Sequence, residues 1–103
     1  MEKLFKIGMR LDENGFEVVE STEYDVKNRT EKSLTCTREG TTGNAVIGVD
    51  KVDAVFGIKE SGHFGSILAF TYASTTEKAE DIIKKGVYDY LKNLKSNIDK
   101  LLS

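Results

Sequence analysis

Residues 73–103 read ASTTEKAEDIIKKGVYDYLKNLKSNIDKLLS. Apolar residues recur in this stretch at spacings of three and four, the period of one helical face: Ile83, Val87, Tyr90, Leu94, Ile98 and Leu101. Ser74 and Glu77 have the spacing of a capping box, with Thr75 and Thr76 as competing caps. The stretch therefore predicts one long C-terminal helix over residues 74–103.

A helix of this length would extend roughly 40 Å at about 1.5 Å per residue. A sheet built from residues 1–73 is expected to cover only part of it. We therefore expect a homo-oligomer, most simply a dimer, joined by the helix. The expected interface residues are Ile83, Val87, Tyr90, Leu91, Leu94, Ile98 and Leu101. A heptad seam would include Asn97, which could set the register, whereas a drifting stripe would include Ile98 instead.

The length and composition indicate one domain, residues 1–103, in a reducing compartment. The chain has 103 residues, of which 39% are hydrophobic, and a single cysteine. Its 15 basic and 17 acidic residues give a net charge of −2, which does not favour nucleic acid as a partner. There is neither a signal-peptide core nor an apolar run of membrane-span length. We expect a soluble cytoplasmic protein.

The first half of the chain predicts an antiparallel meander. Residues 4–11 alternate between apolar and polar, and Asn14 and Gly15 then form a hairpin signal. A second strand over 16–26 has Phe16, Val18, Thr22, Tyr24 and Val26 on one side, with a bulge near Val19 and Glu20. A polar turn at 27–30 leads to a third strand over 31–38.

The second half of the sheet region is less regular. A short strand over 45–49 precedes residues 50–57, which could form one helical turn capped by Asp50 and ended by Gly57. Residues 58–65 are expected to be a flexible connector, and residues 66–73 a strand that is covered on both faces. The fold class is α+β: a bent antiparallel sheet of about five strands, open or barrel-like, followed by one long C-terminal helix.

Two loops and the arginines are candidates for ligand binding. The glycine-rich loop EGTTGN, residues 39–44, could present backbone N–H groups to an anion, or it could be a plain hairpin connection. Two arginines of the meander could clamp a phosphate, and His63 with Phe64 could expose an imidazole beside an aromatic ring. The candidate ligand-binding residues are Arg10, Arg38, Thr41, Thr42, Asn44, His63 and Phe64, with Arg29 as a further arginine.

The sequence does not favour catalysis or metal binding. Cys36 alternates with Leu34 on the apolar side of its strand, which is typical of a structural cysteine, although a Cys36–His63 nucleophile pair can be drawn. Asp50 and Asp53 are better explained by helix capping than by a metal site. We expect neither a metal nor a cofactor.

The order of elements, a twisted antiparallel meander and then one long charged helix, resembles small phage and prophage proteins of low-GC Gram-positive bacteria. It is also loosely similar to the phage-encoded Thoeris anti-defence sponges, which sequester cyclic ADP-ribose-type signals between a sheet and a terminal helix in an oligomer. The resemblance concerns architecture, and residues 76–103 contain no arginine for a phosphate. No functional residue is carried over from it.

The sequence thus favours a non-enzymatic binding protein that acts through a protein partner or by self-association. The alternative is a protein that binds or sequesters a small ligand, a nucleotide or another anion, as the sponges do. A small Cys/His hydrolase is the third hypothesis.

Overall fold

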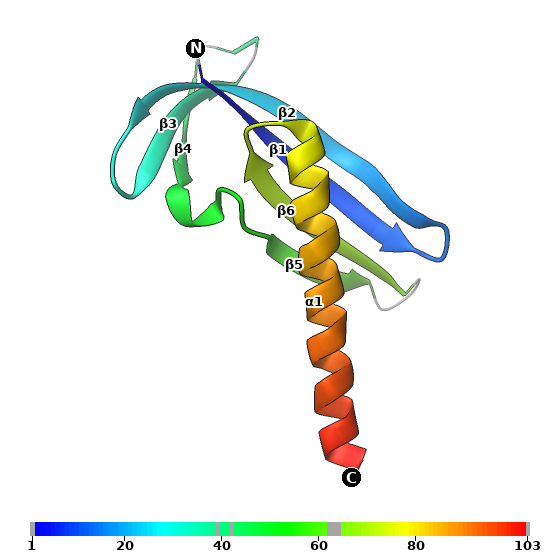
Figure 1. The fold of residues 1–103 in the computed structure, drawn as a ribbon. Helices are drawn as coiled ribbons and strands as arrows, with labels where there is room; N and C mark the ends of the chain where they lie inside the picture. The colour runs from blue at the N-terminus through cyan, green and yellow to red at the C-terminus, as the bar shows by residue number, and fades with distance from the viewer. Residues whose placement is uncertain (1, 39, 42, 62–64, 103) are drawn as a thin grey trace.

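The computed structural model describes residues 2–38, 40, 41, 43–61 and 65–102. This part of the chain forms six strands, one 3-10 turn and one α-helix (Figure 1). They are β1 (Lys3–Asp12), β2 (Gly15–Arg29), β3 (Ser33–Arg38), β4 (Asn44–Gly48), η1 (Val49–Lys51), β5 (Phe56–Ser61), β6 (Ser66–Ala73) and α1 (Thr76–Leu102). The long helix ends the described chain, as the periodicity of residues 83–101 predicts.

The strands form a single sheet in the order β4-β3-β2-β1-β6-β5, and neighbouring strands are antiparallel. The sheet curls into a half-barrel, and α1 lies across one of its faces (Figure 1). The predicted fold class, an α+β protein with a bent antiparallel sheet and one C-terminal helix, is confirmed. The meander β1-β2-β3 is confirmed as well, and β4 extends it.

One strand was not predicted. Residues 58–65 were expected to be a flexible connector, but Phe56–Ser61 forms β5 and pairs with β6. The pairing is irregular between Phe56 and Lys59, and Gly57 between them has a positive φ of 65°. A bulge of this kind interrupts the two-residue alternation by which a strand is recognised. With β1 and β5 as its neighbours, β6 is a central strand, as its apolar composition predicts.

The predicted bulge in β2 is confirmed. The β1–β2 register passes from Gly8↔Glu20 to Met9↔Val18, which leaves Val19 without a partner. An unpaired residue moves all later side chains of the strand to the opposite face. Phe16 accordingly packs with the helix-side core, whereas Tyr24 packs in a cluster on the other face. The expectation that these two residues share one face was therefore wrong.

Other strand boundaries differ because a second irregularity follows in β2. The pairing with β3 shifts between Val26 and Asn28, and β2 continues to Arg29. The residues 27–30 predicted as a turn are therefore mostly strand. The turn itself begins at Thr30, whose Oγ1 accepts hydrogen bonds from the N–H groups of Lys32 and Ser33.

The sheet has an apolar cluster on each face. The helix-side core consists of Ile7, Met9, Ile67, Ala69, Ala73, Ala79, Ile83 and Val87. The opposite cluster consists of Leu4, Leu34, Cys36 and Ile47, with Tyr24, Val26, Val49, Val52 and Tyr72 around it. In β6 the odd residues from Ile67 to Ala73 are buried, while the even ones lie on the other face and are half-buried. Covering on both sides thus explains why this strand has apolar residues on both faces.

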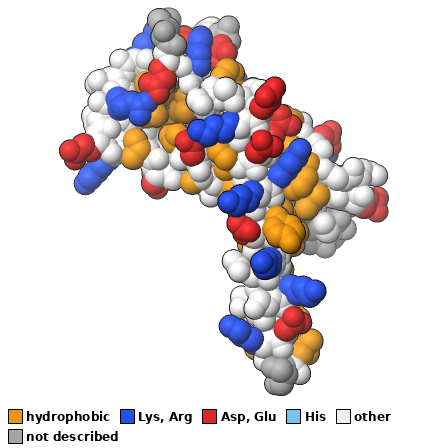
Figure 2. Space-filling view, in the orientation of Figure 1, with side chains coloured by type: hydrophobic (Ala, Val, Ile, Leu, Met, Phe, Trp, Pro, Cys, Tyr) orange, Lys and Arg blue, Asp and Glu red, His pale blue; other side chains and the backbone are white. Residues whose placement is uncertain are grey.

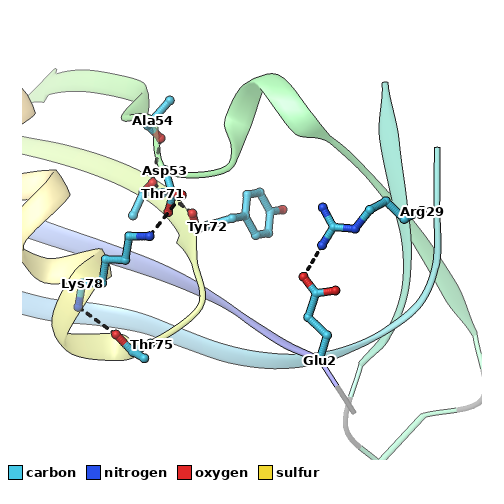
Figure 3. Close-up of polar contacts among 8 residues, drawn as sticks. All are labelled: Glu2, Arg29, Asp53, Ala54, Thr71, Tyr72, Thr75 and Lys78. Atoms are coloured by element: carbon cyan, nitrogen blue, oxygen red, sulfur yellow. Dashed lines mark hydrogen bonds and ion pairs between the residues drawn. The ribbon is translucent and has the colours of Figure 1, made fainter. Parts of the chain in front are cut away.

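Hydrogen bonds join the connection between β4 and β5 to β6, and an ion pair joins it to α1 (Figure 3). The predicted helical turn is present only as η1, and Gly48 precedes it without a side-chain cap, so the capping role expected of Asp50 was wrong. Asp53 has a positive φ of 57°, and its N–H donates to the Tyr72 carbonyl at 2.7 Å. The buried Thr71 hydroxyl donates to the Ala54 carbonyl at 2.7 Å, and Lys78 of α1 pairs with Asp53 at 3.2 Å.

Helix α1 begins one residue later than the predicted capping box implies. Thr75, not Ser74, caps it: the Lys78 N–H donates to the Thr75 Oγ1 at 3.1 Å (Figure 3). Of the 27 residues of α1, only Ala79, Ile83 and Val87 are buried. From Leu91 to Leu102 every residue is exposed, and this part of the helix extends beyond the sheet (Figure 1).

Candidate interaction surface

The arginines that sequence reasoning proposed for an anion site do not converge. Arg10 forms an ion pair with Glu17, in which the Arg10 Nη2 and the Glu17 Oε2 are 2.8 Å apart. The Arg10 Nε also lies 3.9 Å from the Asp12 Oδ2. Arg10 lines a shallow cavity of about 450 Å³ together with Asp12, Glu13 and Ser66. The carboxylates around this cavity disfavour the entry of an anion.

Arg38 lies far from Arg10 along the sheet. Arg10 is opposite Glu17 and Arg38 is opposite Tyr24, so seven residues of β2 separate them. At about 3.3 Å per strand residue this amounts to roughly 20 Å. Arg29 lies further along β2 and forms an ion pair with Glu2 (Figure 3). The structure therefore does not bring Arg10 and Arg38 together around one phosphate.

The described part of the glycine-rich loop is a hairpin connection between β3 and β4. The N–H and the hydroxyl of Thr41 both donate to the Arg38 carbonyl, at 3.1 and 2.9 Å. The Thr37 hydroxyl donates to the Asn44 Oδ1 at 3.3 Å. These groups satisfy one another within the turn. Thr42, His63 and Phe64 lie outside the described residues.

Cys36 is buried in the apolar cluster on the face of the sheet opposite α1. Its side chain is fully buried between β2 and β4 with Leu34 and Ile47. Burial raises the pKa of the Cys36 thiol, and the nearby Glu2 carboxylate raises it further. Both effects disfavour the thiolate, which is the reactive form of cysteine.

We therefore expect Cys36 to react with a thiol reagent in the native protein far more slowly than an exposed thiol does. Unfolding in denaturant should restore the full rate, because it removes the covering side chains. The measurement is the rate of colour release from a disulfide reagent at neutral pH, with glutathione as the reference. A native rate equal to that of glutathione would show that Cys36 is accessible.

Three of the residues predicted for an oligomer interface belong to the chain's own fold. Ile83 and Val87 are 0% and 1% exposed in the helix-side core. Tyr90 is half-buried against this core, and its hydroxyl donates to the Glu60 Oε1 at 2.7 Å. The hydrogen bond to Glu60 raises the pKa of the Tyr90 phenol. Ile83 and Val87 are therefore occupied within one chain and were wrongly assigned to a contact with a second one, whereas Tyr90 is only partly covered.

The other four predicted interface residues are exposed on the projecting part of α1. Leu91 and Leu94 are each 38% exposed, Ile98 is 47% and Leu101 is 85%. Their spacings of three, four and three match the a and d positions of a heptad seam, in a frame that contains Ile98 and not Asn97. We call these four residues the helix-end stripe. Leu102, which is 81% exposed, and Tyr88, which is 66% exposed, flank it.

The helix-end stripe continues the face of α1 that packs on the sheet. At 3.6 residues per turn, Leu94 lies about 20° from Val87 around the helix axis, and Ile98 lies about 20° to the other side. The stripe therefore lies on the sheet-facing side of α1, in the part of the helix that extends beyond the sheet. Only the tertiary structure separates the covered half of this face from the exposed half.

The projecting part of α1 carries a net positive charge. Residues 91–102 contain three lysines, Lys92, Lys95 and Lys100, and one acidic residue, Asp99. Since the whole chain is net negative, the rest of the molecule carries the acidic excess. Lysine side chains predominate on the visible side of the projecting helix, with acidic and hydrophobic side chains near its end (Figure 2). Tyr88, Leu91, Lys92 and Lys95 also line an open hollow of about 340 Å³.

Comparison of the chain with protein-family models, with curated proteins and with solved structures finds no match. The resemblance to phage proteins and to the sponge proteins therefore stays a prediction. Among the described residues, no three His, Cys, Asp or Glu side chains are grouped so that they could hold a metal ion. No helix in the described ranges is long and apolar enough to cross a membrane.

Proposed function

We propose that this protein is a non-enzymatic interaction protein that self-associates through the helix-end stripe. The observation that supports the proposal is a heptad-spaced row of exposed leucine and isoleucine side chains on a helix that extends beyond its own sheet. Such rows are buried in helix pairs, and each residue of one helix fits between residues of the other. A second copy carries the same row and is therefore a complementary occupant.

The helix itself supplies a second reason for association. The twelve residues from Leu91 to Leu102 extend about 18 Å and are all exposed. Isolated helices of about this length are marginal in water, and helices in proteins gain most of their stability by packing an apolar face. A partner on the helix-end stripe would supply the packing that the sheet gives to the first half of α1.

The proposal contains no catalytic step. Among the described residues, Arg10 is paired with Glu17, and Cys36 is enclosed by its apolar cluster. The small-ligand alternative is not favoured, because Arg10 lies far along the sheet from the β3–β4 hairpin that holds Arg38, Thr41 and Asn44.

Sedimentation equilibrium tests the proposal. We expect the wild-type protein at high micromolar concentration to have twice the 11.5 kDa mass of the chain. Leu94→Asp should be monomeric and still folded, because a carboxylate without a partner would be buried in each half of the contact. A cost of about 3 kcal/mol or more corresponds to a dissociation constant raised about 100-fold or more.

Ser96→Asp is the matched control. It introduces the same charge two residues away, on the side of α1 opposite Val87, since nine residues correspond to about 180° of rotation. This variant should remain dimeric, and circular dichroism should show that both variants keep their helix and sheet. An 11.5 kDa wild-type monomer at high micromolar concentration would refute self-association.

A further inference from the structure

We infer that the two copies pair with their helices antiparallel, so that the two sheets lie at opposite ends of the dimer. This inference rests on the proposed self-association and adds its geometry. The helix-end stripe would then form an isologous contact, in which the same residues of both chains meet around a two-fold axis. The axis would pass close to residue 96, midway between Leu91 and Leu101.

The position of the sheet argues against the parallel arrangement. Ile83 and Val87 face β1 and β6, and the helix-end stripe continues the same face of α1. A partner helix seated on this stripe must therefore lie on the sheet side of α1. If it ran parallel, its first half would have to occupy the space in which the sheet already packs. If it runs antiparallel, its own sheet lies beyond the C-terminal end of α1.

The charges favour the same arrangement. In a parallel pair, the two segments 91–102, each with three lysines and one aspartate, would lie next to each other, and segments of like net charge repel. In an antiparallel pair, each lysine-rich helix end points toward the net acidic body of the other chain. Complementary charge of this kind also accelerates encounter of the two chains. A second copy of this chain thus supplies both the apolar row and the opposite charge.

The seam itself is compatible with this register. Leu91 would meet the partner's Leu101, and Leu94 would meet the partner's Ile98. Leu102 would then lie level with the partner's Tyr90, at the rim of β5 where Tyr90 is bonded to Glu60. The antiparallel contact would cover Leu101 and Leu102, the two most exposed leucines of the described helix.

Disulfide cross-linking distinguishes the two arrangements. We propose three samples: Leu91→Cys, Leu101→Cys, and an equimolar mixture of the two that is unfolded and refolded together. Positions 91 and 101 are ten residues, or about 15 Å, apart along a helix. The Cβ atoms of a disulfide lie only about 3.5–4.5 Å apart. An antiparallel dimer should therefore cross-link in the mixture and not in either single sample.

The wild-type chain is the control, because its one cysteine is buried and should give no cross-link. Sedimentation equilibrium of each sample before oxidation separates the two proposals. If the samples are dimeric and Leu101→Cys cross-links to itself, the helices are parallel and only the antiparallel inference fails. Dimers without any cross-link in the mixture would also overturn it. If the wild-type and variant chains are all monomeric, the proposed self-association fails as well.

Discussion

Ile83→Ala should lower the free energy of unfolding by about 2–5 kcal/mol, at any protein concentration. Ile83 is fully buried between α1 and the sheet, in a cluster with Ile7, Met9 and Ala69. Removing three of its side-chain carbons would leave a cavity that β1 and β6 can fill only in part, because their hydrogen bonds hold them in register. Denaturant titration at two protein concentrations measures the effect.

Ile98→Ala is the matched control for this prediction, since it makes the same change on the same helix. Ile98 is about half exposed and belongs to the C-terminal part of α1, which extends beyond the sheet (Figure 1). We expect little loss of stability at a concentration where the chain is monomeric, and a larger loss where it is dimeric. Equal losses for both variants at low concentration would mean that the second half of α1 is packed within the monomer.

Gly86→Ala should destabilise the protein, although the same change stabilises an ordinary helix by about 1 kcal/mol. A Cβ atom at residue 86 would clash with the Val55 Cγ2 and would lie 2.8 Å from the Val55 Cβ. Overpacking of this kind costs about 1–3 kcal/mol, and Val55 belongs to the segment between η1 and β5 that packs against the helix. The glycine thus allows α1 to approach this segment closely.

A second substitution makes the prediction specific. Val55→Ala in the Gly86→Ala background should recover part of the lost stability, so a double-mutant cycle should give a favourable coupling. Ser96→Ala, on the exposed part of α1, is the control and should stabilise slightly. A stabilising effect of Gly86→Ala alone would show that α1 does not approach Val55 so closely.

Local patterns predicted most of the fold. The three-and-four spacing of residues 83–101 predicted α1, two-residue alternation predicted β1, β2 and β3, and apolar residues on both sides predicted β6. The bulge at Val19 was visible because Val19 and Glu20 break the alternation. What this bulge does to Tyr24 was missed, since the face of a residue depends on its pairing with the neighbouring strand. Strand β5 was missed because the irregularity at Gly57 hides its period.

The candidate site was predicted less completely. Sequence reasoning included all four residues of the helix-end stripe in the interface, but it could not separate them from Ile83 and Val87, which have the same period. It also grouped Arg10 with Arg38. The distance between these two residues depends on the register of β2 with β1 and with β3. Residue type and spacing report which face of an element is apolar, not which part of that face the rest of the chain covers.

The sequence by itself determined that this chain has a bent antiparallel sheet and one long amphipathic helix, because helical and strand periods are local properties of the residues. The tertiary structure decided where the sheet ends along that helix. Ile83 and Val87 lie on the N-terminal side of this limit and are buried. Leu94 and Ile98 lie on its C-terminal side and are exposed. Burial depends on which distant strands pair beneath the helix, and that pairing is set by the whole chain.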